Sequence, residues 1–294
     1  MSIDPTAVVD RRAELGHDVE IGPQCYVGPQ VRLGDGCRLL PRVTLLGPAE
    51  FGPGNVFYPG CVLGAAPQDL KYKGGPTRLE VGAGNIFREH VTIHRGTEVD
   101  RISGGTTRIG SHGLFMVSVH VAHDCDVGDH VIVANTCQIA GHVRIEDGVV
   151  IGGATCMHHF VTIGRYAYIG GMTRITHDVP PFMKVSGYNQ SVRGVNVEGL
   201  RRWRFAAESI RSVKSAARLL YARQGERSPL RTAEALAAIE SDGLLRDENV
   251  RYLVECLRRK LEVGIYGRVR EHTRSDQDAD RAAFYGSGRP GAGG

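Results

Sequence analysis

Apolar residues recur at every sixth position over two long stretches of the chain, from Ile3 to Leu63 and from Ile109 to Ile175. An α-helix, with about 3.6 residues per turn, cannot keep a period of six on one face. A three-sided parallel β-helix can, because each side takes one hexad and each coil takes three. The hexads of the second stretch open with Ile109, Phe115, Val121, Val127, Val133, Ile139, Ile145, Ile151, Met157, Ile163, Ile169 and Ile175. The pattern predicts a β fold, a parallel β-helix of hexapeptide repeats.

Two polar segments interrupt the repeat and predict loops that leave the coil. Residues 65–78 read AAPQDLKYKGGPTR and contain two prolines, and residues 98–107 read EVDRISGGTT. Val81, Phe87 and Ile93 restore the period between them. We therefore expect one β-helix domain with two excursions.

The repeat is expected to end at the sequence DVPP, residues 178–181, because proline lacks the N–H that a further rung would use. Beyond it the spacing of apolar residues becomes helical. We predict a β-helix domain over residues 1–182, an α-helical C-terminal domain over 183–265 and a disordered tail over 266–294. Helices are expected within 194–223, 232–239 and 247–263.

Composition and charge exclude several classes of protein. We find no run of about 18 apolar residues, so no membrane span is expected. The start, MSIDPTAVVD, lacks the basic and apolar regions of a signal peptide. The net charge of +4 comes without the basic stripe and stacking aromatics of a nucleic-acid binder. No CxxC pair exists, and the five cysteines at the fifth hexad position are expected to be small buried hydrophobes in a cytoplasmic protein: Cys25, Cys37, Cys61, Cys125 and Cys137.

A cluster of histidines lies inside the second stretch of repeats. Its members are His120, His123, His142, His158 and His159. Residues 18 apart occupy the same place in successive coils, roughly 5 Å apart. One column therefore contains His123, Gly141 and His159, and the next contains Asp124, His142 and Phe160.

This cluster has the groups that acyl transfer requires. His123 is the candidate general base, since imidazole takes up a proton near neutral pH. Asp124 or a nearby carbonyl group could fix its tautomer. The N–H of Gly141, which has no side chain, could approach a developing oxyanion. No serine or cysteine lies beside a base as a nucleophile would, which favours transfer without a covalent intermediate. A zinc site of three histidines shared between subunits is the main alternative, and metal analysis would distinguish it.

The chain resembles a known family in six segments of its sequence. The segments read PQDLKYKGGPTRLEVG, REHVTIHRGT, VHVAHDCDVG, AGHVRIEDG, HDVPPF and GVNVEGLRR. They resemble the UDP-N-acetylglucosamine O-acyltransferases of lipid A biosynthesis, the LpxA family of hexapeptide-repeat acyltransferases, over roughly residues 3–222. The resemblance implies a left-handed β-helix and a homotrimer with active sites between subunits. It implies transfer of an acyl group from acyl carrier protein to the 3-hydroxyl of UDP-N-acetylglucosamine, with no cofactor and no metal.

The resemblance also implies roles for individual residues. His123 matches the catalytic histidine, Asp124 its partner and Gly141 the oxyanion donor. Gly171 matches the position that sets acyl length, where glycine favours a longer, (3R)-3-hydroxyacyl chain. The remaining matches are substrate-binding residues: Gln68, Asp69, Lys71, His94, His120, His142, His158, His159, Asn196, Glu198 and Arg202.

Charge agrees with this reading, and some departures leave alternatives open. Arginines at 201, 202 and 204 suit a diphosphate, and the run Arg211, Lys214, Arg218, Arg223 and Arg227 suits an acidic carrier protein.

His159 stands where relatives commonly have glutamine, and Trp203 lies in a stretch that is usually more basic. The alternatives are an acetyl-CoA-dependent sugar O-acetyltransferase, the N-acyltransferase of the same pathway and a zinc enzyme of the γ-carbonic-anhydrase type. Acyl length, and an acceptor with a 3-amino group, stay open.

Overall fold

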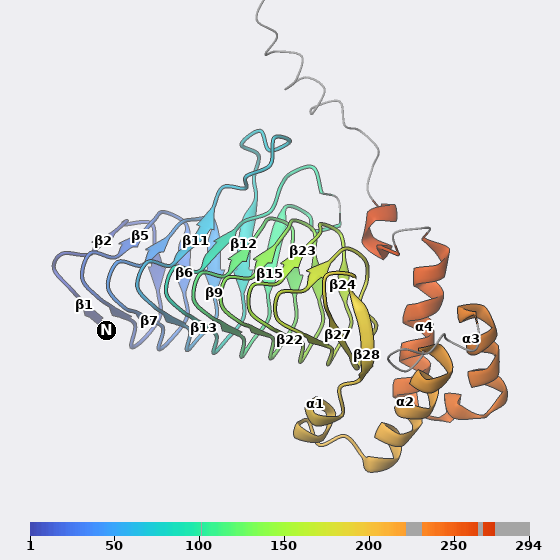
Figure 1. The fold of residues 1–294 in the computed structure, drawn as a ribbon. Coiled ribbons are helices and arrows are strands. Elements are labelled where there is room, and N and C mark those ends of the chain that lie inside the picture. The colour runs from blue at the N-terminus through green and yellow to red at the C-terminus, as the bar shows by residue number, and fades with distance from the viewer. Residues whose placement is uncertain (101, 222–230, 264–266, 274–294) are drawn as a thin grey trace, which may run out of the picture.

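The chain folds into a long three-sided prism with a cluster of helices at one end (Figure 1). This computed structural model describes residues 1–100, 102–221, 231–263 and 267–273. In these ranges no helix is long and apolar enough to cross a membrane. The predicted β-helix is confirmed, because successive coils contribute short strands to three parallel sheets.

Neighbouring strands in a sheet come from successive coils, so residues 18 apart pair in register, as Phe115 does with Val133. Sheet 1 contains β1 (Ser2–Ile3), β4 (Glu20–Ile21), β7 (Arg38–Leu39), β10 (Val56–Phe57), β13 (Ile86–Phe87), β16 (Leu114–Phe115), β19 (Ile132–Val133), β22 (Val150–Ile151), β25 (Tyr168–Ile169), β27 (Met183–Ser186) and β28 (Ser191–Val195). Sheet 2 contains β2 (Val8–Val9), β5 (Tyr26–Val27), β8 (Thr44–Leu45), β11 (Val62–Ala65), β14 (Thr92–His94), β17 (His120–Val121), β20 (Gln138–Ile139), β23 (Cys156–Met157) and β26 (Arg174–Ile175). Sheet 3 contains β3 (Glu14–Leu15), β6 (Val31–Leu33), β9 (Ala49–Phe51), β12 (Arg78–Val81), β15 (Thr106–Ile109), β18 (Asp126–Val127), β21 (Arg144–Ile145) and β24 (Thr162–Ile163).

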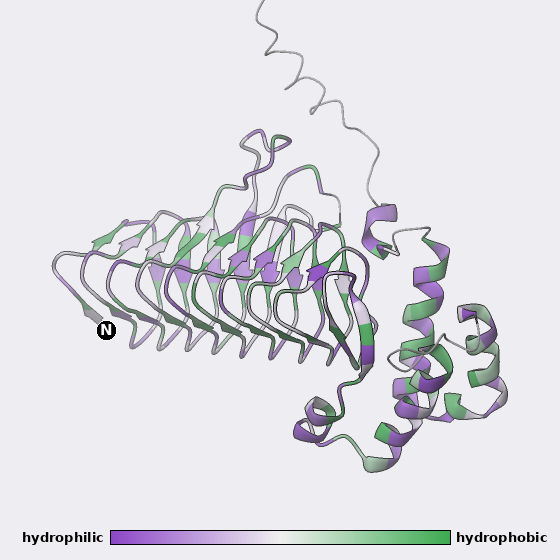
Figure 2. Cartoon of the chain, in the orientation of Figure 1, coloured by the Kyte–Doolittle hydropathy of each residue, from purple (hydrophilic) through white to green (hydrophobic). Residues whose placement is uncertain are grey.

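The residues that open the hexads fill the inside of the prism. Phe57, Phe87 and Phe115 form a stack in which successive ring centroids are 5.2 Å apart. The five cysteines at the fifth hexad position are buried and unpaired, as expected for small hydrophobes. Figure 2 shows apolar residues recurring from coil to coil along the strands.

Both predicted excursions are present as loops. One joins β11 to β12 over residues 66–77, and the other joins β14 to β15 over residues 95–105. Each connects sheet 2 to sheet 3, so both loops leave the prism along the same edge (Figure 1). This edge carries the histidine cluster.

The helical part begins later than residue 183. Strand β27 still pairs with β25 in the coil, and β28 pairs antiparallel with β27, so the chain caps sheet 1 before it turns helical. The hairpin satisfies backbone groups that the last rung would otherwise expose. The helices are α1 (Val197–Arg202), α2 (Ala207–Leu220), α3 (Thr232–Ser241) and α4 (Glu248–Glu262), with a short η1 (Leu244–Arg246).

The prediction of a disordered tail from residue 266 is wrong for residues 267–273. The short helix η2 (Val269–Thr273) packs against the β-helix, and Arg268 is 6% exposed. Its polar composition suggested disorder, but hydrogen bonds to the coil hold it, as described below. The rest of the predicted tail, residues 266 and 274–294, lies outside the described residues.

Candidate active site

The turns between strands form three edges of the prism, and the histidines gather along one of them. Turns from sheet 2 to sheet 3 contain residues 122–125, 140–143 and 158–161, which we call the histidine edge. The 18-residue period stacks these turns: the N–H of His142 donates to the carbonyl of His123 at 3.0 Å. The predicted columns are therefore present.

His123 and Asp124 form a hydrogen-bonded pair at the centre of this edge. Nδ1 of His123 lies 2.8 Å from Oδ2 of Asp124, whose side chain is fully buried. The carboxylate also accepts hydrogen bonds from the N–H and hydroxyl of Thr97 and from the hydroxyl of Ser103. Burial works to raise the pKa of Asp124, but the hydrogen bonds from His123, Ser103 and Thr97 outweigh it and hold the pKa below its usual value.

The ionised Asp124 sets the tautomer of its neighbour. A carboxylate without a proton can only accept, so neutral His123 carries its proton on Nδ1. The lone pair of Nε2 then points away from Asp124. This is the arrangement that a general base needs.

Asp100 fixes the tautomer of His142, in the next coil, in the same way. It was not among the site residues predicted from the sequence. Its Oδ2 lies 2.5 Å from Nδ1 of His142, whose ring stacks on Phe160 with centroids 4.3 Å apart. Burial opposes ionisation, yet hydrogen bonds from His142, Ser103 and Ile102 hold the pKa of Asp100 at about 2. Asp100, Thr97 and Ser103 lie in or beside a loop that does not follow the hexad repeat. In that loop, the acidic and hydroxyl side chains were the only indication of a functional role in the sequence.

Gly141 lies directly against the ring of His123. A Cβ atom at Gly141 would be 2.6 Å from Cε1 and 2.7 Å from Nε2 of that ring. Any larger residue would have to displace the imidazole. His123, the predicted base, and Gly141, the predicted oxyanion donor, are therefore in contact.

The loop over residues 66–77 brings Asp69 to the same place. Its Oδ2 lies 3.7 Å from Nε2 of His123, on the side of the ring away from Asp124. The N–H of Lys71 donates to Asp69 and shapes this turn. Gln68 is exposed beside them.

His94 and His120 extend the edge toward the N-terminus. Their rings meet edge to face with centroids 4.8 Å apart, and Nδ1 of His120 lies 2.8 Å from the hydroxyl of Thr92. His94 is 7% exposed, and its Nδ1 has no hydrogen-bond partner among the described residues. Burial, with the neighbouring His120 and His123, lowers the pKa of His94 to about 4. Burial also lowers the pKa of His120.

Stability is expected to fall as the pH drops from about 6.5 to about 4, with His94 contributing up to about 3 kcal/mol. Because its folded-state pKa lies below the ordinary value, the unfolded chain binds a proton that the folded chain does not. This contribution is present above pH 6.5 and is lost toward pH 4. His159 and His177, with pKa values of about 4, act in the same direction. Urea unfolding of wild type and His94→Gln across this range measures the effect, and identical pH dependences would contradict it.

His158 and His159 lie at the same edge one coil further on. Their ring centroids are 3.9 Å apart, and His159 also contacts Phe160. Burial, with His158 and Arg268 nearby, lowers the pKa of His159 to about 4. At neutral pH the ring of His159 is therefore uncharged.

The remaining predicted residues lie at other edges of the same chain. Asn196 caps α1, accepting from Gly199 and donating to the carbonyl of Tyr166, which lies in a turn from sheet 3 to sheet 1. Glu198 and Arg202 are on the same helix, and Trp203 contacts His130 of that edge. Gly171 lies in a turn from sheet 1 to sheet 2. One chain therefore does not bring all predicted residues together.

Two groups of side chains at the histidine edge could hold a metal ion. They are Asp69, His123 and His142, and Asp100, Asp124 and His142. Neither contains three histidines, and no group of three histidines occurs within the described ranges. A zinc site of the kind considered above would require a histidine from another copy.

The sequence and the fold of this chain are similar to those of known proteins. The chain is 45% identical over 258 residues to the acyl-[acyl-carrier-protein]–UDP-N-acetylglucosamine O-acyltransferase of Anaeromyxobacter sp. (strain Fw109-5). The aligned residues cover 88% of this chain and 97% of the relative. The chain belongs to the UDP-N-acetylglucosamine O-acyltransferase family. It is therefore an acyltransferase. The family model described as UDP N-acetylglucosamine O-acyltransferase, domain 2, matches residues 178–266.

Solved structures of this O-acyltransferase family share the fold. LpxA from Acinetobacter baumannii superposes with a TM-score of 0.82 at 39% identity, covering 92% of this chain and all of that chain. The UDP-N-acetylglucosamine acyltransferase LpxA from Bacteroides fragilis superposes with a TM-score of 0.81 at 36% identity, covering 87% of this chain and 96% of that chain. The likeness confirms the predicted left-handed parallel β-helix with a C-terminal helical part.

Proposed function

We propose that the protein transfers a (3R)-3-hydroxyacyl group from acyl carrier protein to the 3-hydroxyl of UDP-N-acetylglucosamine, the first step of lipid A biosynthesis. The observation that carries the proposal is the contact of the Asp124–His123 pair with Gly141. The names of curated relatives give the same donor and acceptor. Transfer from a thioester to a hydroxyl needs a base and a donor to the oxyanion, and we assign these roles to His123 and to the N–H of Gly141.

In the proposed mechanism, Nε2 of His123 removes the proton from the 3-hydroxyl as its oxygen attacks the thioester carbonyl. Asp124 stabilises the imidazolium that forms, and the N–H of Gly141 donates to the oxyanion. When the C–S bond breaks, His123 returns the proton to the departing thiolate. The acyl group passes directly from sulfur to oxygen, with no acyl-enzyme, cofactor or metal.

The neighbouring side chains are assigned to substrate binding. Asp69, 3.7 Å from Nε2 of His123, is placed to accept from a sugar hydroxyl next to the reacting one. His94, which packs against the ring of His120, is assigned to the same group. The other residues assigned to substrates at this edge are Gln68, Lys71, His120, His142, His158 and His159.

We assign the complete active site to the cleft between two copies of a homotrimer. A three-fold assembly of parallel prisms would bring Asn196, Glu198, Arg202 and Gly171 of one copy to the histidine edge of the next. The outward side of sheet 1 supports such packing, since Ile86 and Tyr168 are each 39% exposed. The outward apolar column there consists of Val56, Ile86, Leu114, Ile132, Val150 and Tyr168.

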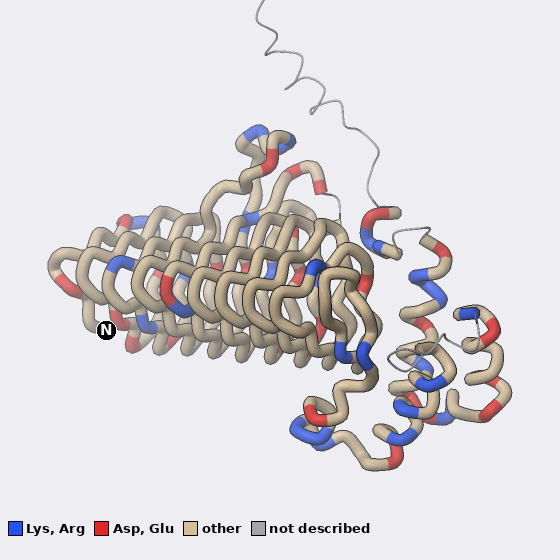
Figure 3. The backbone as a smooth tube through the Cα atoms, in the orientation of Figure 1, with Lys and Arg blue, Asp and Glu red and all other residues tan. Residues whose placement is uncertain are grey.

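Basic side chains are proposed to hold the charged parts of both substrates. Arg211, Lys214 and Arg218 are exposed on α2 and suit an acidic carrier protein. The arginines at 201 and 202 on α1 suit the diphosphate. Figure 3 shows Lys and Arg gathered on α1 and α2. Arg223 and Arg227, predicted for the same face, lie outside the described residues.

Two further assignments complete the proposal. Gly171, without a side chain, leaves room for a longer acyl chain at its edge. The free, buried cysteines support a reducing cytoplasmic location.

The test of the proposed function is an assay of the purified protein with hydroxyacyl carrier proteins of several chain lengths and with UDP-N-acetylglucosamine. We expect an ester at the sugar 3-position and a clear preference for one length. A preference for coenzyme A thioesters would instead indicate a sugar O-acetyltransferase. A preference for a 3-amino acceptor would replace the proposed acceptor.

Gly141→Ala is expected to lower kcat by about 100-fold, because the added methyl group displaces the His123 ring from the position in which it removes the proton of the acceptor hydroxyl. In a His123→Ala background the same change should cost less than about threefold, since the displaced ring is already absent. Initial rates of the four proteins, with circular dichroism to verify folding, measure this. Independent, additive losses would argue against Gly141 and His123 acting at one site.

A further inference from the structure

The segment of residues 267–273, which we call the strap, returns to the histidine edge after the last helix. It lies outside residues 178–266 that match the family model. Figure 1 shows η2 beside the β-helix, far along the chain from the coils it contacts. The strap therefore adds side chains to a site that the repeats alone do not supply.

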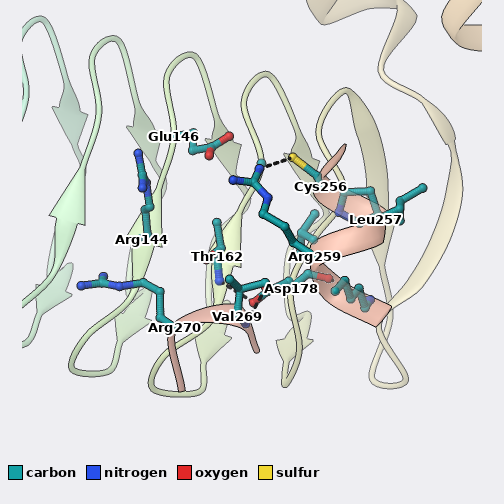
Figure 4. Close-up of a pocket in the computed structure, with 13 residues that line it drawn as sticks. Arg144, Glu146, Thr162, Asp178, Cys256, Leu257, Arg259, Val269 and Arg270 are labelled. Carbon is teal, nitrogen blue, oxygen red and sulfur yellow. Dashed lines mark hydrogen bonds between the residues drawn. The ribbon is translucent and has the colours of Figure 1, made fainter. Parts of the chain in front are cut away.

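Asp178 anchors the strap at its first residues. Its N–H donates to the carbonyl of Gly267 at 3.0 Å, and its Oδ2 accepts from the N–H of Val269 at 2.9 Å. The other carboxylate oxygen accepts from the N–H of Thr162 in the coil. Figure 4 shows Asp178 between Thr162 and Val269. Two bonds from one residue fix the backbone on both sides of Arg268.

The anchored strap places Arg268 against His158. The Arg268 side chain is buried, and its Nη1 lies 3.3 Å from Nδ1 of His158 and 3.3 Å from the carbonyl of Thr176. Its Nε donates to Glu271 at 2.6 Å, which holds the guanidinium in place. Further along the strap, Arg270 donates to the carbonyl of His142 at 2.8 Å.

Two contacts compete for Nδ1 of His158. Besides Arg268, the carbonyl of His159 lies 3.2 Å away. A carbonyl requires an N–H, whereas a guanidinium has only donors and requires a lone pair. With Arg268 in place, neutral His158 therefore carries its proton on Nε2. Without Arg268, the carbonyl of His159 favours the proton on Nδ1.

We propose that Arg268 is a positioning residue of the acyl-transfer site, which fixes His158 as a hydrogen-bond donor through Nε2–H to the substrate. The inference rests on the proposed function, in which His158 contacts substrate. The strap thus determines that Nε2 of His158 donates and that Nδ1 accepts. A strap with only a structural role would stabilise the helices but would not affect which nitrogen of His158 carries the proton.

The direct test is the tautomer of His158, read from ¹⁵N spectra of histidine-labelled protein at about pH 8, where ordinary imidazoles are neutral. His158→Gln assigns the signal. Wild type is expected to show the Nε2–H form, and Arg268→Met the Nδ1–H form. Arg268→Lys should retain part of the wild-type signal. Unchanged tautomers in Arg268→Met would overturn the proposal.

Kinetics test the consequence for the reaction. Arg268→Met should lower kcat/KM about three- to tenfold, as loss of one substrate hydrogen bond does, and by less than about twofold in a His158→Ala background. Glu271→Gln is the matched control: it removes the negative charge but keeps a side-chain oxygen that can accept from Nε of Arg268, so we expect kcat/KM within about twofold of wild type. Equal losses from Arg268→Met in both backgrounds would overturn the positioning role.

The two experiments separate this inference from the function on which it rests. If His158→Ala alone has wild-type kinetics, the assignment of His158 to substrate fails and the role of Arg268 in the reaction fails with it. The tautomer measurement still decides the contact itself. If His158→Ala is impaired while Arg268→Met is not, the proposed function stands and the positioning role is wrong.

Discussion

His123→Ala is expected to lower kcat by about three orders of magnitude while the protein stays folded. The alanine leaves no group to take the proton of the acceptor hydroxyl. The carboxylate of Asp124 accepts from Thr97 and Ser103, and the Oδ2 of Asp69 lies 3.7 Å from Nε2 of His123. The measurement is the initial rate of acyl transfer from hydroxyacyl carrier protein to UDP-N-acetylglucosamine at saturating substrate.

The matched control for this prediction is His17→Ala. His17 also lies in a turn of the coil, but it is exposed and remote in sequence from the histidine edge. We expect its kcat to stay within about twofold of wild type, as usual for surface substitutions away from a site. Near-normal turnover of His123→Ala would remove His123 as the base.

Asp124→Asn is expected to lower kcat by at least about two orders of magnitude, because an amide no longer fixes the proton of His123 on Nδ1. The asparagine can donate to Nδ1, which leaves the proton on Nε2 and removes the lone pair that accepts from substrate. It also has one oxygen where the carboxylate accepts from Thr97 and Ser103. The measurement combines kcat with the melting temperature.

Thr107→Val separates the two effects of Asp124→Asn. The hydroxyl of Thr107 accepts from the backbone N–H of Asp124 and does not contact its carboxylate. Its loss leaves a buried N–H unpaired and should cost about 1–3 kcal/mol of stability. We expect kcat to change by less than about threefold at a temperature where the variant is folded. A loss of kcat as large as that of Asp124→Asn would show that loop stability, rather than the tautomer, controls turnover.

The repeat made both the fold and the grouping of the central candidate residues predictable. Apolar residues at every sixth position specify a coil of 18 residues, and that number alone brings Gly141 against His123 and His142 beside Asp124. The backbone pairing follows from burying each hexad-opening residue inside the prism. The sequence alone could therefore predict that the candidate base, its candidate partner and the candidate oxyanion donor lie together.

Features outside the period could not be predicted in the same way. Asp100 and Ser103 reach the site from a loop, where the distance from the histidines along the sequence gives no position in space. Asn196 and Gly171 lie at other edges, so the roles proposed for them would require a second copy of the chain. The strap has a polar sequence, and a few individually placed hydrogen bonds, rather than a buried apolar face, determine its position.

The measurement that tests the central claim most directly is the intact mass of the protein mixed with hydroxyacyl carrier protein, with and without UDP-N-acetylglucosamine. Direct transfer by the His123–Asp124 pair predicts unmodified protein in both mixtures, with acylated sugar and free carrier formed only in the second. A protein adduct with the mass of the acyl group, formed without the acceptor and consumed when the acceptor is added, would contradict the account.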